Sequence, residues 1–144
     1  MKRASTWQAR AASQLGYREE AGNRTKFGAW YGLDGEPWCA MFMSWSFFMS
    51  GLPLPASTAK GFAGCSNGAD WFEARGRFTD RPAKGHLVFF DWDDKGGLDH
   101  IGIVERVLPD GSVQTIEGNT GDGSGDGTLD GVFRRARKAG IVGY

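Results

Sequence analysis

A change of sequence pattern near Pro82 constrains the fold more than any other feature of this chain. Before it, apolar residues recur every three or four positions or form one long run, which is typical of helices. After it, short β-branched and aromatic segments alternate with turn residues, which indicates strands. Because the helices precede the strands, the expected fold class is α+β, with N-terminal helices packed on a largely antiparallel β-sheet.

The predicted helices share apolar spacing and terminal signals. Ser5 or Thr6 is suited to cap the first helix, and Ser66 or Asn67 the last. The predicted helical segments are 7–15, 37–50 and 68–75, with a structured loop over 22–35. The predicted strands are 87–90, 101–104, 113–116, 132–135 and 141–144.

Composition sets the number of domains and excludes some partners. A chain of 144 residues with 40% hydrophobic residues can bury one core, so we expect a single domain over 1–144, acting as a monomer. Seventeen basic and seventeen acidic side chains cancel, which gives no electrostatic case for nucleic acid or an anionic membrane as a partner. No signal peptide and no membrane-spanning segment is predicted, so we expect no membrane insertion.

Cys39 is the first candidate for chemistry. Pro37 suits the first position of a helix, which places Cys39 in the first turn of an almost wholly apolar segment. The unpaired amides and the dipole at that helix end stabilise a thiolate and lower a cysteine pKa. The alternatives are a small buried hydrophobe, or a structural disulfide with Cys65 that would block the thiol.

His100 is the candidate base, and a hairpin supplies its neighbours. The turn signal Leu-Pro-Asp-Gly at 108–111 joins two predicted strands. With Pro109 and Asp110 at its centre, Val107 faces Ser112, and counting outward sets His100 opposite Asn119 and Gly102 opposite Glu117. Both polar side chains then reach the imidazole, although a one-residue bulge would turn Glu117 to the other face.

Together these residues predict a cysteine nucleophile with an oriented base. One imidazole nitrogen takes the thiol proton, while the other donates to Glu117 or Asn119. The remaining histidine, His86, has no acidic neighbour in sequence and is predicted to lie at the surface. Under the plain alternative, Cys39 is a core residue and the polar side chains simply end strands.

Several segments resemble the CHAP domain, the cysteine- and histidine-dependent amidohydrolase/peptidase module of cell-wall lytic enzymes, notably phage endolysins. The resemblance covers most of the chain. The segments that carry it are 23–32, 37–40, 85–90, 99–104, 116–120 and the Gly-rich stretch leading to 132–135. The resemblance implies a papain-like fold with Cys39 as nucleophile, His100 as base, and Glu117 with Asn119 orienting the histidine.

The resemblance also implies a function and its setting. The expected function is peptidoglycan hydrolysis at an amide bond, as an N-acetylmuramoyl-L-alanine amidase or an endopeptidase, with bacterial peptidoglycan as the partner. The expected setting is an endolysin made in the host cytoplasm without a signal peptide and acting on the cell wall. One alternative is an NlpC-type peptidase, disfavoured by Glu117 and Asn119 in place of a second histidine; another is a catalytically silent wall-binding or virion structural module.

No cofactor and no metal are expected. Some relatives bind calcium through acidic residues before the nucleophile, but here that stretch offers only Asp34 and Glu36. The segment 91–96 has acidic spacing reminiscent of a calcium loop, yet Lys95 occupies a ligand position and the distal glutamate is missing. Trp30, Trp38 and Trp92 could line a substrate groove or support the core, and the sequence does not choose between these roles.

Overall fold

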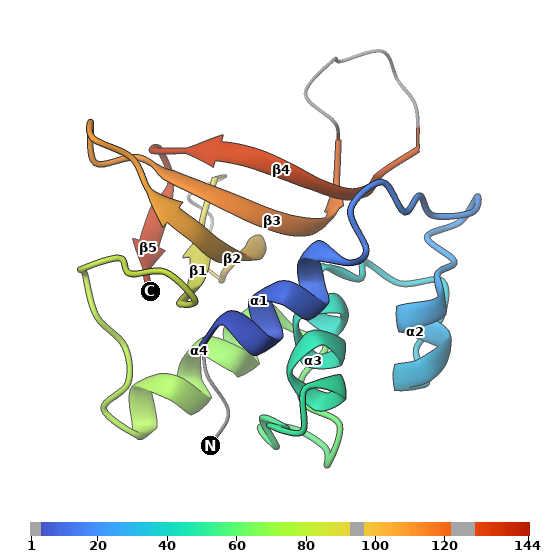
Figure 1. The fold of residues 1–144 in the computed structure, drawn as a ribbon. Helices are drawn as coiled ribbons and strands as arrows, with labels where there is room; N and C mark the ends of the chain where they lie inside the picture. The colour runs from blue at the N-terminus through green and yellow to red at the C-terminus, as the bar shows by residue number, and fades with distance from the viewer. Residues whose placement is uncertain (1–3, 93–96, 122–128) are drawn as a thin grey trace.

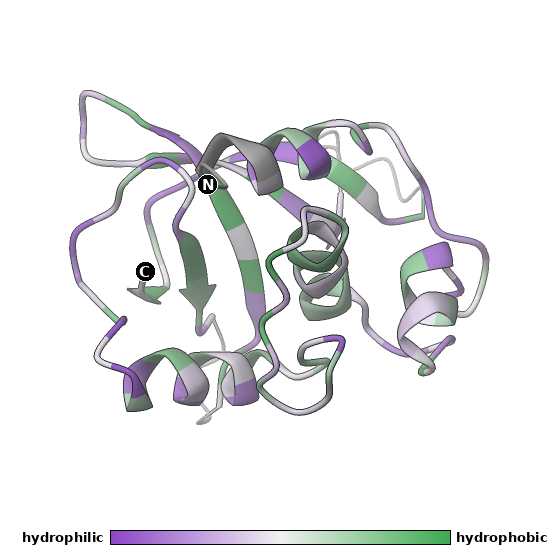
Figure 2. Ribbon diagram, turned by 60° about the horizontal axis from the view of Figure 1, so that its bottom comes forward, coloured by the Kyte–Doolittle hydropathy of each residue, from purple (hydrophilic) through white to green (hydrophobic). Residues whose placement is uncertain are grey.

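The helix that carries Cys39 lies in the middle of the molecule (Figure 2). The structure, a computed structural model, describes residues 4–92, 97–121 and 129–144. Helix α3 spans Cys39–Met49, and eight of its eleven residues are buried, which confirms the prediction of a buried helix. Its N-cap is Trp38, so Pro37 lies just before the helix and not in its first turn as predicted. Cys39 is therefore the first helical residue.

Three further helices surround α3: α1 (Ala4–Ala12), α2 (Lys26–Tyr31) and α4 (Cys65–Ala74). The sequence prediction treated the α2 segment as loop, because six residues are too few to show a helical period. The Thr25 hydroxyl caps α2 by accepting from the Gly28 amide at 2.9 Å. The prediction for α4 began too late, because the cap is Gly64, and the Ser66 hydroxyl instead accepts from the Leu98 amide.

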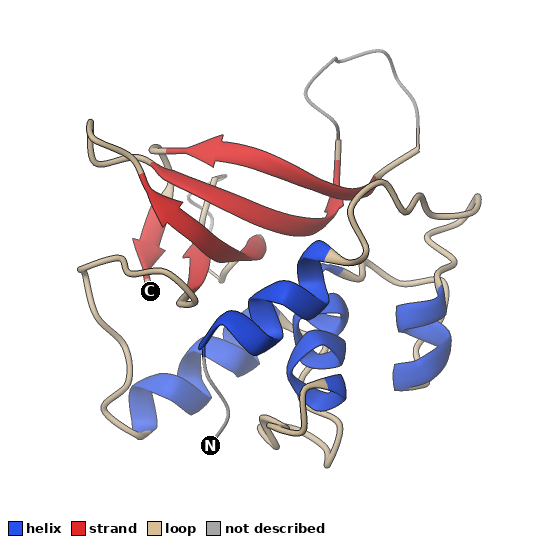
Figure 3. Ribbon diagram, viewed as in Figure 1, coloured by secondary structure: helices blue, strands red, loops and turns tan. Residues whose placement is uncertain are grey.

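The second half of the chain forms one five-stranded sheet. Its strands are β1 (Leu87–Phe90), β2 (His100–Val107), β3 (Val113–Thr120), β4 (Gly131–Arg137) and β5 (Ile141–Gly143). Their order is β4-β3-β2-β1-β5, and every neighbouring pair is antiparallel. Figure 3 shows the helices gathered on one side of the molecule and the strands on the other. The α+β class is confirmed.

The main core lies between α3 and the sheet. Apolar residues from β2 and β3, including Ile101, Ile103 and Ile116, pack with Phe42 and Met43 of α3 in one buried cluster. Each such side chain contributes about 1.5–3 kcal/mol when fully buried. This packing holds α3 against β2 and β3 of the sheet (Figure 1). No helix within the described part of the chain is long and apolar enough to cross a bilayer.

The hairpin of β2 and β3 has the predicted alignment near the candidate site, although its turn differs. Ile103 pairs with Ile116, as the predicted count requires, but Val107 pairs with Val113 and not with Ser112. A bulge between Val104 and Arg106 absorbs the extra turn residue and restores the count. The longer turn and the bulge therefore offset one another, and the register from Val104 toward His100 is the predicted one.

Gly102 shows that the restored alignment extends to Glu117. A Cβ atom placed on Gly102 would lie 2.7 Å from the Glu117 Cγ, so the two residues lie directly against one another. Only glycine leaves room here for a carboxylate side chain to lie flat on the neighbouring strand. Glu117 fills the space that the missing Gly102 side chain leaves on this face of the sheet.

Candidate active site

Cys39 lies where the backbone of α3 favours negative charge. The residue is 7% exposed and holds the first helical position, where the amides of the first turn have no intrahelical partner. The pKa of the thiol lies well below its usual value, chiefly because Cys65 donates a hydrogen bond to the sulfur. Burial opposes this shift, while His100 and the Ala40 amide add to it. The sulfur is therefore set up as a thiolate.

His100 begins β2 and lies opposite Phe90 of β1 in the sheet. Its Nε2 lies 2.8 Å from the Oε1 of Glu117, which leaves Nδ1 as the nitrogen for the Cys39 side. Burial lowers the pKa of His100, but the hydrogen bonds and charges of Cys39 and Glu117 outweigh burial and raise that pKa to about 9. The structure thus brings the predicted nucleophile, base and carboxylate together as a chain of interacting groups.

Glu117 is fully buried and ionised, a state that requires several partners. Its two carboxylate oxygens accept four hydrogen bonds: from His100, from the Thr115 hydroxyl at 2.6 Å, and from two nitrogens of Arg137. Burial raises the pKa of Glu117, but Arg137 and His100 outweigh it and hold that pKa at about 2. The carboxylate is therefore charged and fixed beside the imidazole.

Arg137 is a residue that the sequence analysis missed. Its Nε lies 2.9 Å from Oε2 and its Nη2 lies 2.6 Å from Oε1 of Glu117, a bidentate pair. In the sheet register Arg137 lies opposite Val113, four residues from Glu117, so strand pairing alone does not reveal the contact. The available signal was physical: a buried carboxylate beside an imidazole needs a cation, and β4 carries three arginines.

Asn119 hydrogen-bonds to the start of α3 and not, as predicted, to His100. Its Oδ1 accepts a hydrogen bond from the Trp38 backbone amide at 2.8 Å, and its Nδ2 donates to Asp130. The side chain therefore does not hydrogen-bond to His100. Asn119 has φ of 56°, in the left-handed region that asparagine tolerates, at an irregularity in the β3–β4 pairing. This turn of the backbone directs its amide toward the start of α3.

Cys65 lies beside the nucleophile without being bonded to it. The two sulfurs are 3.7 Å apart and both cysteines are free, so the alternative of a structural disulfide is not what the structure shows. Cys65 begins α4 just as Cys39 begins α3. The hydrogen bond to Cys39 and burial both raise the pKa of the Cys65 thiol, which keeps its proton.

Two aromatic rings flank the imidazole. Trp92 stacks on His100 with ring centroids 5.2 Å apart, and Phe90 lies 5.9 Å away. Trp92 is half-exposed and also lies under the guanidinium of Arg137, so it shields the His100–Glu117 pair from solvent. Trp38 is fully buried and belongs to the core, which removes it as a groove residue.

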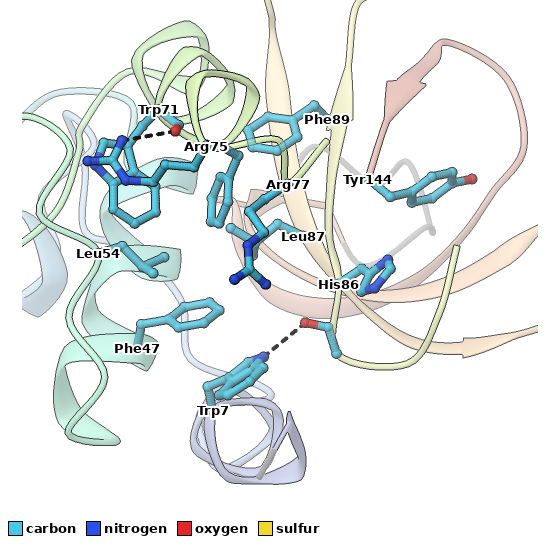
Figure 4. Close-up of a pocket in the computed structure, with 12 residues that line it drawn as sticks. Trp7, Phe47, Leu54, Trp71, Arg75, Arg77, His86, Leu87, Phe89 and Tyr144 are labelled. Atoms are coloured by element: carbon cyan, nitrogen blue, oxygen red, sulfur yellow. Dashed lines mark hydrogen bonds between the residues drawn. The ribbon is translucent and has the colours of Figure 1, made fainter. Parts of the chain in front are cut away.

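His86, the rival base, lies in a separate place. It lines a cavity of about 460 Å³ between the C-terminal ends of α3 and α4 and the start of β1 (Figure 4). The cavity walls are largely aromatic, with Trp7, Phe47 and Trp71 among them. Cys39, Cys65 and His100 lie at the opposite ends of these elements. His86 is only partly exposed and not a fully surface residue, and it does not meet the nucleophile.

No group of three or more metal-ligating side chains occurs within residues 4–92, 97–121 and 129–144. The acidic stretch 91–96 lies mostly outside the described residues, and so does the Gly-rich stretch over 122–128.

Comparison with known families agrees with this geometry. The family model described as the CHAP domain matches residues 30–119, more than half of the chain. The chain belongs to the CHAP domain family. CHAP domains are generally cysteine- and histidine-dependent amidohydrolases or peptidases that act on peptidoglycan. No match was found among curated proteins or among solved structures. The matched range contains Cys39, His100, Glu117 and Asn119, whereas Arg137 lies beyond it.

Proposed function

We propose that this CHAP domain hydrolyses an amide bond of bacterial peptidoglycan, with Cys39 as nucleophile and His100 as general base and acid. The observation that carries the proposal is the chain of contacts from the Cys39 sulfur through His100 to a buried Glu117, whose Oε1 lies 2.8 Å from Nε2. A cell wall offers two bonds suited to this chemistry: the muramoyl-L-alanine amide and the peptide bonds of the stem or cross-bridge. The enzyme is accordingly an amidase or an endopeptidase.

The first chemical step is attack of the Cys39 thiolate on the amide carbonyl carbon. The low pKa of Cys39 and the raised pKa of His100 favour the thiolate–imidazolium pair before substrate binds. The tetrahedral oxyanion then requires preorganised donors. The Cys39 amide serves here, because the first amide used in the α3 ladder is that of Phe42, which donates to the Trp38 carbonyl, and the Ala40 amide already favours the sulfur.

His100 completes both half-reactions. As imidazolium it protonates the departing amine, which leaves the acyl group on the Cys39 sulfur as a thioester. The neutral imidazole next removes a proton from water, whose oxygen attacks the thioester carbonyl and releases the carboxylic acid and the thiolate. Glu117 holds the ring in one tautomer through Nε2 and stabilises the positive charge each time it forms.

We also propose that the fold is papain-like. The supporting feature is that the nucleophile begins a buried helix while the base begins a strand of an antiparallel sheet packed on that helix. An endolysin setting is part of the same proposal, and its support is the resemblance of the motif segments to wall-lytic enzymes.

Purified cell walls test the proposal. The wild-type protein is expected to release new amino groups, while Cys39→Ala releases none above background and keeps its thermal unfolding midpoint within a few degrees. Mass spectrometry of the released fragments then identifies the bond, because amidase and endopeptidase products differ in composition. Release by Cys39→Ala at the wild-type rate would exclude the thiol mechanism. A wild-type protein that binds walls without releasing fragments would favour the silent binding module instead.

A further inference from the structure

Two thiols from separate helices meet at the candidate active site. Cys39 and Cys65 are 26 residues apart in sequence, yet their sulfurs lie 3.7 Å apart. Each of the two residues is 7% exposed, so both cysteines are buried without being wholly cut off from solvent. The mechanism proposed above uses only Cys39 as a covalent group. Cys65 is thus a buried thiol beside the nucleophile with no assigned chemistry.

The two sulfurs differ in character. Cys39 faces the imidazole of His100 and the first amides of α3, both of which favour its anion. Cys65 retains its proton and donates it toward Cys39. A reactive thiolate with a second thiol in contact is the arrangement of redox-responsive cysteine pairs, in which one sulfur is oxidised and the other resolves it.

We propose that Cys39 and Cys65 form a peroxide-responsive pair, in which oxidation of Cys39 is resolved by Cys65 into a disulfide that reversibly closes the active site. Formation of the disulfide does not depend on the proposed function; only its consequence, the loss of hydrolysis, rests on that function. The ligand class is a hydroperoxide, a molecule small enough to reach a sulfur that a polymer substrate must also reach.

The chemistry balances in two steps. The Cys39 thiolate attacks one oxygen of hydrogen peroxide and the O–O bond breaks, which leaves a sulfenic acid on Cys39. The other oxygen leaves as hydroxide and takes the proton held on the His100 imidazolium, so it departs as water. The Cys65 sulfur then attacks the Cys39 sulfur, the S–O bond breaks, and the Cys65 thiol proton ends in the water that leaves. In total two thiols and one peroxide give one disulfide and two waters. A reducing dithiol reverses the result by thiol–disulfide exchange.

The geometry makes the second step short. A disulfide bond is about 2.0 Å long, so the sulfurs must approach by about 1.7 Å from their 3.7 Å separation. Both cysteines occupy the first position of a helix, where side-chain rotation meets no preceding helical turn. Resolution by Cys65 is intramolecular, and it competes with further oxidation of Cys39 to the sulfinic acid, which is not reversed by dithiols.

The test compares the wild-type protein with Cys65→Ser, which keeps a small hydroxyl donor but forms no disulfide. A hydrogen peroxide pulse is expected to lower wild-type hydrolysis more than about tenfold, with a mass loss of about 2 Da and a linked Cys39–Cys65 peptide. Dithiothreitol should restore wild-type activity to within about twofold. Cys65→Ser should lose its own activity as well, gain about 32 or 48 Da at Cys39, and stay inactive after dithiothreitol.

The mass measurement separates this inference from the proposed function. A linked peptide in a wild-type protein that never hydrolyses cell walls would support the pair and overturn the proposed function. An active wild-type protein whose Cys39 goes straight to the sulfinic acid, with the same recovery as Cys65→Ser, would overturn the pair and leave the hydrolase standing. Cys39→Ser is the control for specificity, since its remaining Cys65 is expected to resist the same pulse.

Discussion

His100 and His86 lie at opposite ends of the paired strands β1 and β2. The ring of His100 has Glu117 on Nε2 and faces Cys39, and its pKa is raised to about 9. The Nδ1 of His86 is buried without a hydrogen-bond partner in the described structure, beside an aromatic cavity. These are the only two histidines of the chain. The surrounding charges, and not the residue type or the strand, therefore determine which imidazole is suited to act as a base.

The largest effect on activity should come from replacing His100, with the replacement of His86 as its control. His100→Ala is expected to lower kcat/KM on cell-wall fragments by about 10³-fold or more, because both proton transfers lose their carrier. His86→Ala is the matched control and should stay within about twofold, since its side chain touches no reacting group. Steady-state kinetics on a soluble fragment checks both. Equal losses in the two variants would mean that the aromatic cavity takes part in the reaction.

Removing the carboxylate should bring His100 closer to an ordinary histidine. Glu117→Gln is expected to lower kcat/KM about 10²-fold, because the imidazolium loses its counter-charge. Glu117 helps to raise the pKa of His100, so the alkaline limb of the pH profile should move from near pH 9 to lower pH. An unmoved limb in Glu117→Gln would show that the carboxylate does not set the protonation of the base.

Arg137 should have a smaller effect of a different kind. Arg137→Met is expected to lower kcat/KM about tenfold. Arg137 helps to hold the pKa of Glu117 at about 2, so the variant should lose activity at higher pH on the acid side than the wild type. Arg134→Met is the control, because Arg134 pairs with Glu105 away from the site. Identical acid limbs in the two arginine variants would contradict the assigned role.

Asn119 provides the smallest predicted change. Asn119→Gly keeps the positive φ but removes the amide that accepts from the Trp38 backbone, so it should cost about 1 kcal/mol of unfolding free energy. Urea denaturation measures this loss. The alkaline limb near pH 9 should stay where it is, because Asn119 does not hydrogen-bond to His100. A shifted limb would instead place Asn119 with Glu117 as a direct partner of the histidine.

The sequence was sufficient for the parts of the molecule that local pattern controls. The apolar run after Pro37 predicted the buried helix, and the alternation of strand and turn residues predicted all five strands to within a few residues. The hairpin count brought His100 to Glu117 although its turn was placed one residue short, because a bulge compensates. Strand pairing constrains register strongly wherever one face is buried.

The parts that sequence did not predict depend on long-range packing. Arg137 is paired with Val113, four residues from Glu117, and its side chain extends along the strand to reach the carboxylate. Strand-pairing rules consider only directly opposed and diagonal residues, so they do not predict this contact. The approach of Cys65 to Cys39 requires the relative placement of α3 and α4, which no local pattern encodes. The left-handed backbone of Asn119 redirects its amide from the histidine to α3. All three features depend on how distant segments pack together, which local sequence patterns do not specify.

The pH dependence of Cys39 alkylation tests the central claim most directly. Peptide mapping after short exposure to iodoacetamide gives the rate at Cys39 alone, in the wild type and in His100→Ala. The wild-type rate is expected to be near its plateau already at neutral pH, whereas His100→Ala should reach its plateau only at higher pH. A wild-type rate that rises through the ordinary thiol range, about pH 8.5, and matches His100→Ala would contradict the thiolate–imidazolium pair.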